Sequence, residues 1–281
     1  MNILTFDIEE WFHLLDFDAT RTEDKWGEYE IRIHENVDRI LRILDATDTK
    51  ATFFIIGWIA KRYPEVVRKI AEKYDIGSHT MTHQLVWQQS PEAFKQDVET
   101  SIKLLQDITG KPIKSFRAPG YSIRESEKYA FETLYKLGIE TDSSIFPAVH
   151  AHGGMPSFPA TKPCIIEYNG VKLKEFPISF TNIMGKPIVY AGGGYFRLFP
   201  YKLIKHFTDN ALYNISYIHP RDLDSTQPVI DGLSSSRRFR SYVGLKNAEK
   251  KLIKYLTDFK FTDIATANET IDWGKADIIK L

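Results

Sequence analysis

Short runs of β-type residues alternate with helical patterns along this chain, and that alternation limits its fold more than any other feature of the sequence. The apolar runs at 3–6 and 51–56 are typical of buried strands. Between these runs, one helical face carries Val37, Ile40, Leu41 and Leu44. Strands that alternate with helices from the first residues onward predict parallel β/α units rather than a β-sandwich.

The same alternation continues through the rest of the chain. After the second strand, one helical face carries Ile59, Tyr63, Val66, Val67 and Ile70. The run Ser90-Pro91-Glu92 has the N-cap, the first-turn proline and the acid that open a helix, which we expect to end at Gly110. Further helices are expected at about 125–137 and 245–259, and short strands at 139–141, 175–178 and 215–218.

The length of the chain suits one domain. With 281 residues, 43% of them hydrophobic, it can bury a core the size of one α/β barrel. We therefore expect a single barrel domain over residues 1–281. The segment at about 146–200 is rich in Gly and Pro, which predicts an inserted region of loops or a hairpin. The segment at about 237–281 is expected to form a C-terminal extension of helix and strand.

Charge and composition exclude several classes of partner. Lys plus Arg and Asp plus Glu both total 37, so no long-range field favours nucleic acid or an acidic membrane surface. Cys164 is the only cysteine, which excludes an internal disulfide and is compatible with a reducing compartment. The first residues lack the basic region of a signal peptide, and the apolar run at 51–60 is too short to span a bilayer. We expect a cytoplasmic protein without a transmembrane segment.

Two acids follow the first strand. Side chains two apart on a strand share a face, so Asp7 and Glu9 should project together at the C-terminal end of that strand. In parallel barrels this is the catalytic end. Two carboxylates at this end could bind a cation together. Taken alone, the motif is explained equally well by an exposed, solvated turn.

Two histidines could supply that cation's other ligands. At a spacing of four residues, His79 and His83 would lie on one side of a helical turn, and a carboxylate would complete three protein ligands with one position open for water. The alternative is two surface histidines at a chance spacing. Thr80 stands where a zincin metalloprotease motif has glutamate, so Asp7 is the natural candidate for the general base.

Three more segments carry polar residues at expected strand ends. Arg117 could hold a carboxylate base by a bidentate contact, and the turn that follows it exposes backbone N–H groups able to stabilise an oxyanion. Asp142, with two serines after it, also suits a turn or a helix cap. His219 ends an apolar strand, where it needs either a hydrogen-bond partner or a task.

These five segments, in this order, resemble the polysaccharide deacetylase family with the NodB homology domain, over roughly residues 3–220. The family's motifs run T-F-D-D, H-[ST]-x-x-H, R-x-P-Y, D-x-x-W and L-x-H. The second motif matches fully at His79-Thr80-Met81-Thr82-His83. The first departs at Ile8, where the metal-binding Asp usually stands, although some relatives carry D-x-D or D-x-E.

The other departures concern the wall of the sugar site. Gly120 displaces Tyr121 by one position, and the Trp of the fourth motif is missing after Asp142. Beyond the shared core, several segments look like the subgroup found with bacterial exopolysaccharide and O-antigen synthesis clusters, which extends the resemblance to nearly the whole chain. Those segments are 142–147, His150, 192–197 and the tail at 240–261.

The resemblance implies a distorted (β/α)7-type barrel. It also implies hydrolysis of an N-acyl amide, usually acetyl, on a sugar of a microbial polysaccharide or its precursor, which could be linked to a carrier. The cofactor implied is one divalent metal ion, expected to be Zn²⁺, which would polarise the amide carbonyl and activate water. The sugar, the acyl group and the oligomeric state stay open.

The resemblance also implies a role for each motif. The expected metal ligands are Glu9, His79 and His83. Asp7 would be the base, held by Arg117, although Asp7 and Glu9 could exchange roles. His219 would protonate the leaving amine, oriented by Asp142. The backbone that would contact the substrate and its oxyanion is Pro119, Gly120 and Tyr121.

Three rival functions are considered. A deformylase or another C–N hydrolase, such as one acting on a cyclic ureide, could use the same scaffold. A decayed, metal-free glycan-binding protein would fit the missing Trp and the shifted Tyr. A non-haem iron oxygenase also uses two His and one carboxylate, but nothing in the sequence suggests a 2-oxoglutarate site. The basic cluster at 237–240 is typical of a solvated face, and the alternative is a contact with a phosphate or pyrophosphate.

Overall fold

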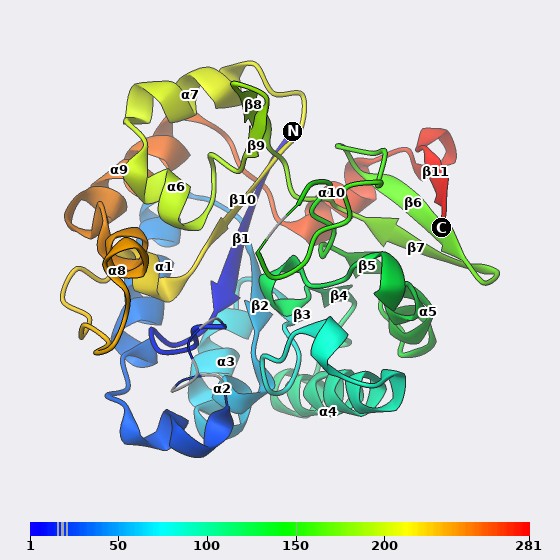
Figure 1. Cartoon of the computed structure of the whole chain (residues 1–281), viewed down its shortest axis with the longest axis horizontal. Coiled ribbons are helices and arrows are strands. Elements are labelled where there is room, and N and C mark those ends of the chain that lie inside the picture. The colour runs from blue at the N-terminus through cyan, green and yellow to red at the C-terminus, as the bar shows by residue number, and fades with distance from the viewer. Residues whose placement is uncertain (16, 18–19, 21, 150) are drawn as a thin grey trace.

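A curved sheet of nine strands forms the centre of the computed structural model, which describes residues 1–15, 17, 20, 22–149 and 151–281 (Figure 1). The strand order is β10-β1-β2-β3-β4-β5-β7-β6-β11. The strands are β1 (Asn2–Ile8), β2 (Thr52–Ile55), β3 (Asp75–Ser78), β4 (Ser115–Phe116), β5 (Thr141–Asp142), β6 (Cys164–Tyr168), β7 (Val171–Glu175), β10 (Asn214–Ile218) and β11 (Ile278–Lys280). Six of the seven residues of β1 are buried, as expected of a parallel strand covered on both faces.

Seven neighbouring strands of this sheet, from β10 through β1 to β7, run parallel. The chain that leaves β7 links the two ends of this run. The backbone N–H of Ile178 donates to the carbonyl of Ile145 after β5, at 2.9 Å, and the N–H of Ile215 in β10 donates to Ser179 Oγ, at 3.0 Å. The predicted α/β fold, a distorted (β/α)7-type barrel, is confirmed.

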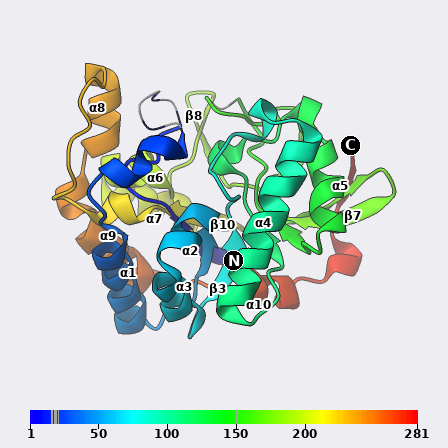
Figure 2. The ribbon, with the colours of Figure 1, turned by 90° about the horizontal axis from the view of Figure 1, so that it is seen from below.

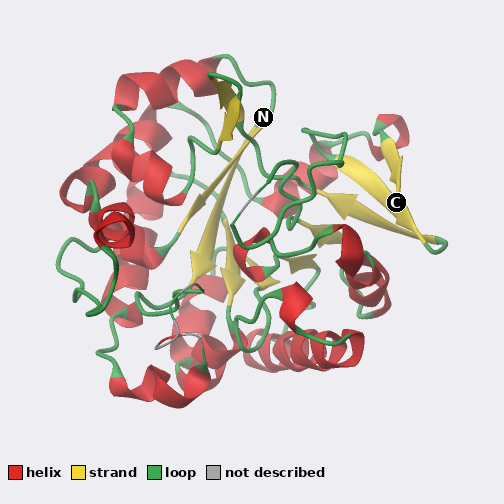
Figure 3. Cartoon of the chain, viewed as in Figure 1, coloured by secondary structure: helices red, strands yellow, loops and turns green. Residues whose placement is uncertain are grey.

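Helices surround the strands (Figure 3). Viewed from below, α8 and α9 lie at one side of the barrel and α5 and β7 at the other (Figure 2). The helices are α1 (Ile33–Thr47), α2 (Gly57–Arg62), α3 (Pro64–Ala71), α4 (Pro91–Thr109), α5 (Tyr129–Lys136), α6 (Gly193–Leu198), α7 (Tyr201–Asp209), α8 (Ser235–Tyr242), α9 (Leu245–Asp258) and α10 (Ile264–Thr270). The predicted caps of α4 are present, since Ser90 Oγ accepts from the N–H of Ala93 and Gly110 is left-handed.

Two predicted elements differ from the structure because of proline. The helical face predicted from Ile59 to Ile70 belongs to two helices, α2 and α3, which meet at Pro64. Proline has no N–H to continue the first helix but is well suited to begin the second. The strand predicted at 175–178 ends at Glu175, and Pro177 could not have donated to a neighbouring strand.

The segment at 146–200 contains one strand of the barrel as well as added structure. Its β6–β7 hairpin places β7 beside β5, and a separate two-stranded sheet joins β8 (Thr181–Ile183) to β9 (Lys186–Ile188). After residue 237 the chain completes α8, then forms α9 and α10, and ends with β11, which pairs with β6. His150 lies outside the described residues.

Where the chain is described, no helix combines the length and the apolar character needed to cross a bilayer.

Candidate metal and hydrolase site

The polar residues predicted for the site come from the ends of neighbouring strands. Asp7 and Glu9 lie at the end of β1, His79 directly follows β3, Arg117 directly follows β4, and His219 directly follows β10. Parallel strands end at the same edge of the sheet, so these side chains meet at one rim of the barrel.

Glu9, His79 and His83 form a buried group that could hold a metal ion. One oxygen of Glu9, Oε1, lies 3.3 Å from His79 Nε2 and 3.0 Å from His83 Nε2. The ligand atoms of the three residues all lie within 4.8 Å of one another. One carboxylate and two imidazoles are a donor set that suits a catalytic zinc site with an open position.

The hydrogen bond of His79 leaves its Nε2 free to bind a metal. Its Nδ1 lies 2.7 Å from the backbone carbonyl oxygen of Arg117. A carbonyl oxygen only accepts, so Nδ1 carries the proton and the lone pair of Nε2 faces Glu9. Metal-binding histidines usually donate their second N–H in this way, and the residues present therefore fit a bound divalent ion.

The electrostatics of Glu9 favour its charged form. Burial opposes ionisation, but His83, His219 and His79 outweigh it and hold the pKa of Glu9 well below its ordinary value. The carboxylate is therefore ready to accept a cation without first losing a proton.

The two histidines lie on a loop, and the prediction of a helical turn was wrong. Thr80 and His83 both have left-handed backbone angles, with φ of 65° and 57°. The N–H of His83 donates to Thr80 Oγ1 at 3.1 Å. The imidazoles converge because of this loop geometry, not because of the spacing of a helix.

Neighbouring elements hold that loop in place. The backbone N–H groups of Gly57 and Trp58, at the start of α2, donate to the carbonyls of Thr80 and Met81 at 2.8 and 2.9 Å. A Cβ at Gly57 would lie only 2.9 Å from Met81 Cα, so only glycine allows this close approach. From α4, Asp97 accepts from the N–H of Met81 at 2.6 Å.

Asp7 is paired with Arg117. Arg117 Nη1 lies 2.7 Å from Asp7 Oδ1 and 2.7 Å from Thr5 Oγ1, and the arginine is fully buried. Its other donors contact Ser143, with Nη2 to Oγ at 2.9 Å and Nε to the carbonyl at 3.2 Å. The predicted partner is correct, but the contact uses one guanidinium nitrogen rather than two, because Ser143 takes the others.

His219 is oriented by a residue other than the predicted one. Its Nδ1 and its backbone N–H both lie 3.0 Å from Asp222 Oδ2. The second oxygen of Asp222 accepts from Arg197 Nε at 2.8 Å. Arg197 is fixed in turn by the carbonyls of Val243, at 2.6 Å, and Arg240, at 3.1 Å. The prediction that Asp142 orients His219 was therefore wrong.

This arrangement keeps His219 protonated in the metal-free protein. Burial lowers its pKa, but Glu9, Asp222 and Asp7 outweigh that effect and raise the pKa of His219 to about 9. Nε2, the nitrogen that faces the site, lies 3.9 Å from Asp7 Oδ2 and 3.8 Å from Glu9 Oε1. Asp7, Glu9 and His219 thus form a second group with metal-ligand spacing, which shares Glu9 with the first.

Asp142 belongs to a buried acid pair beneath the site. It accepts from Ser144 Oγ at 2.5 Å and interacts with Glu175 of β7, whose Oε1 accepts from the N–H of Ile145 at 3.0 Å. Burial raises the pKa of Asp142 to about 6 and, together with Asp142, raises that of Glu175 well above its ordinary value. The pair therefore keeps a proton to a higher pH than two separate, solvated carboxyl groups would.

The turn after Arg117 is retained but offers fewer donors than predicted. Gly120 and Tyr121 have φ of 59° and 52°, in a short 3₁₀ turn that includes Pro119. The N–H of Tyr121 donates to the carbonyl of Ala118 at 3.2 Å. Of the two predicted oxyanion donors, Gly120 is the one that this bond leaves for the role.

Four residues at the site were not predicted from the sequence. They are His13, Glu175, Arg197 and Asp222. His13 is buried, its Nδ1 accepts from the N–H of Glu10 at 3.3 Å, and its ring centroid lies 5.8 Å from that of His83. Asp222 could have been found, because an acid three residues after His219 suits a capping box, which is present here. No sequence pattern connects Arg197 or Glu175 to the site.

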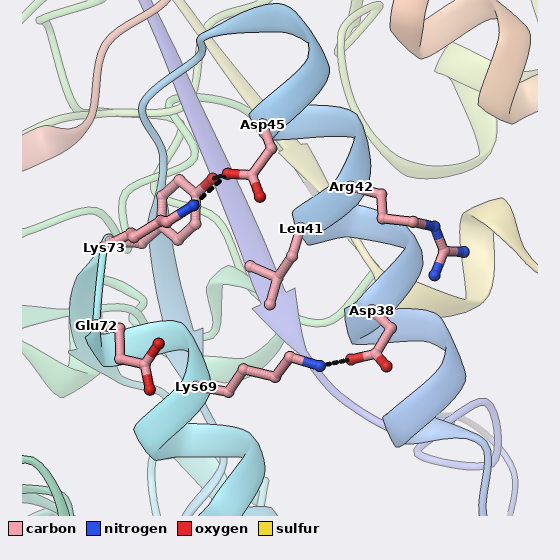
Figure 4. Close-up of a pocket in the computed structure, with 8 residues that line it drawn as sticks. Asp38, Leu41, Arg42, Asp45, Lys69, Glu72 and Lys73 are labelled. Atoms are coloured by element: carbon pink, nitrogen blue, oxygen red, sulfur yellow. Dashed lines mark hydrogen bonds and ion pairs between the residues drawn. The ribbon is translucent and has the colours of Figure 1, made fainter.

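A separate surface pocket lies between α1 and α3 (Figure 4). Ion pairs cross it, with Lys69 Nζ 2.6 Å from Asp38 Oδ1 and Lys73 Nζ 3.0 Å from Asp45 Oδ1. None of the residues that line it belongs to the strand-end group. It has no part in the candidate site.

The comparisons with known proteins divide the chain in two. Residues 4–140 match the family model for polysaccharide deacetylase, and residues 143–269 match a domain of unknown function, DUF3473. A peptidoglycan-N-acetylglucosamine deacetylase of Bacillus cereus is 31% identical over 104 residues, which are 37% of this chain and 47% of that protein. A chitooligosaccharide deacetylase of Azorhizobium caulinodans is 33% identical over 82 residues, which are 28% of this chain and 39% of that protein.

A solved structure is similar over a greater length. A candidate polysaccharide deacetylase from Mycobacterium smegmatis superposes with a TM-score of 0.68, at 16% identity, over 100% of this chain and 92% of that one, which supports the fold. The matched region spans less than half of the curated relatives described above. The family model and these homologues support membership of the polysaccharide deacetylase family for residues 4–140.

Proposed function

We propose that this protein is a metal-dependent carbohydrate N-deacetylase. The observation that carries the proposal is the convergence of Glu9, His79 and His83 beside the Asp7–Arg117 pair. The deacetylase relatives named above support the same reaction class. A bound divalent ion, which we propose to be Zn²⁺, would supply Lewis acidity for the amide carbonyl and for water.

The base in this mechanism is Asp7. Its carboxylate is buried and fixed by Arg117 at 2.7 Å, so it can take a proton from the attacking water without reorienting. Glu9 lies against both imidazoles and serves as the metal ligand. These contacts support the assignment of Glu9 to the metal and of Asp7 to proton transfer.

The acid is His219. Its Nε2 faces the site and its Nδ1 is held by Asp222, so the ring is oriented to pass a proton to the leaving sugar amine. Gly120 donates its backbone N–H to the developing oxyanion. In this scheme Arg197 is a positioning residue, which acts on His219 through Asp222.

The substrate we propose is an N-acetylated sugar of a microbial polysaccharide or its precursor. A role with exopolysaccharide or O-antigen synthesis extends this proposal from the sequence resemblance. We also propose the cytoplasmic location that was expected from the sequence. Cell fractionation of a native host would test the location.

The direct test is to incubate the purified protein, with added Zn²⁺, with N-acetylated oligosaccharides and nucleotide-linked N-acetyl sugars, and to measure released acetate and formate. We expect acetate, and we expect a chelator to abolish its release. Formate release would favour a deformylase instead. A protein that binds glycan but neither binds metal nor releases an acid would contradict the proposal.

A further inference from the structure

A buried arginine beside His219 makes no ion pair with any residue that the structure describes. Arg221 is 8% exposed, and its Nη2 is buried without a hydrogen-bond partner. Among the residues that the structure describes, no ion pair involves its guanidinium. A buried, unpaired charge costs several kcal/mol in real proteins, so such groups usually have a partner in the functional state.

The nearby acids are already engaged by other groups. Asp222 binds His219 through one oxygen and Arg197 through the other. Asp224 lies 2.5 Å from Arg32 Nε and also accepts from Thr226. Neither carboxylate forms an ion pair with Arg221.

The surroundings of Arg221 are cationic and aromatic. Its guanidinium carbon lies 5.9 Å from the ring centroid of Tyr242 in α8. Burial lowers the pKa of Arg221 and outweighs the opposite effects of Asp222 and Tyr242, and Arg197 and Arg237 lower the pKa further. Asp222, the described carboxylate that offsets the charge of Arg221, is shared with Arg197 and His219, so a bound anion would relieve the remaining repulsion.

The position of Arg221 connects this charge to the reaction site. It lies two residues after His219, a span of at most about 7 Å along the backbone. A guanidinium offers a planar fork of donors that matches the oxygens of phosphate and carboxylate. An anionic group attached to the sugar could therefore reach Arg221 while the amide lies at His219.

We propose that Arg221 forms an anion subsite, which binds a phosphate or carboxylate group of the substrate next to the amide that is hydrolysed. That the anion is part of the substrate rests on the proposed function. That an anion binds at Arg221 does not. The sugar would then be either linked to a phosphate or neighboured by an acidic sugar.

Calorimetric titration of the full chain with inorganic phosphate, pyrophosphate and glucuronate tests this subsite. Each titration is repeated after chelation, so that binding at a metal ion does not contribute. We expect Arg221→Met to weaken binding of the preferred anion about 10- to 100-fold in both conditions, because charged hydrogen bonds are lost. Arg221→Lys should weaken it less, since the charge remains without the fork.

The matched control is Arg238→Met, which removes the same charge from an exposed position on α8. It should change the affinity less than twofold, because solvent screens an exposed charge. Tighter binding of phosphate or pyrophosphate would identify a phosphate-linked sugar, and tighter binding of glucuronate an acidic glycan. Equal affinity of the wild type and Arg221→Met, or no saturable binding of any probe, would overturn the subsite.

Thermal unfolding gives a second readout. Without anion, Arg221→Met should unfold at the same temperature as the wild type or higher, because an unpaired buried charge has been removed. Phosphate should raise the midpoint of the wild type alone. A lower midpoint for Arg221→Met without anion would show a structural arginine and contradict the proposal. These measurements need no turnover, so they can fail or succeed independently of deacetylation.

Discussion

The two halves of the barrel contribute to the site in different ways. Residues before 140 supply the metal group, the base and Arg117, all at or just after the ends of neighbouring strands. Residues after 143 supply His219 from a strand end, but its orientation depends on a short 3₁₀ turn and on Arg197 in α6. The difference teaches that function at a strand end can be located from sequence, whereas support from a separate element, such as Arg197 in α6, cannot.

The largest expected effect tests the first half. In His79→Ala or His83→Ala, one of two imidazole ligands is missing, so the bound metal and amide hydrolysis should both be lost, with a fall in kcat of about 10³-fold or more. Metal content by mass spectrometry and acetate release check this. If either variant retained stoichiometric metal and normal turnover, the metal group would be wrongly assigned.

The second test distinguishes the role of His219, from the second half, from metal binding by the first half. His219→Ala should keep the metal and lose about 10²- to 10⁴-fold in kcat, the range expected for a missing general acid. Loss of metal in this variant would place His219 among the ligands, together with Asp7 and Glu9. Normal turnover would remove it from the mechanism.

A smaller effect tests the support of His219 against the prediction made from sequence. Asp222→Asn should lower kcat by about 10- to 100-fold, by analogy with partners of metal-binding histidines. Asp222 helps to raise the pKa of His219, so the pKa of His219 should be lower in this variant. The alkaline limb of the pH–activity profile should therefore shift to lower pH.

Asp142→Asn is the matched control for that pH shift. Its side chain contacts Ser144 and Glu175, not His219, so the alkaline limb should stay where it is. A shift with Asp142→Asn and none with Asp222→Asn would reverse the assignment.

Parts of the fold and site follow from residue patterns alone. The parallel barrel was predictable because buried strands and amphipathic helices alternate with clear periods, and Asp7, Glu9 and Arg117 were predictable because they mark strand ends. The conformation of the loop at His79 was not, because hydrogen bonds from two other elements, α2 and α4, stabilise its left-handed residues. The role of Arg197 was hidden for the same reason.

The smallest expected effect concerns the acid pair that joins the halves beneath the site. Folding raises the pKa of Asp142 to about 6 and that of Glu175 well above its ordinary value, so the folded protein binds more protons than the unfolded chain. Stability should therefore fall as pH rises from the unfolded values through the folded ones.

Glu175→Gln should reduce this dependence, because its amide can donate to Asp142 at any pH. Relative to the wild type, the variant should gain about 1–3 kcal/mol in free energy of unfolding as pH rises from about 5 through the folded pKa values of the pair. Urea unfolding across that range measures the difference. A constant difference at every pH would show that the pair does not share a proton.

The left-handed loop at Thr80 and His83 has a consequence for how the protein would acquire its ion. Its backbone is already fixed by α2 and α4, so arrival of a cation would order no additional chain and would lose no further conformational entropy. The rate of metal binding would then be governed by dehydration of the ion and by access to the rim. The metal-free protein should keep the secondary structure of the metal-bound one.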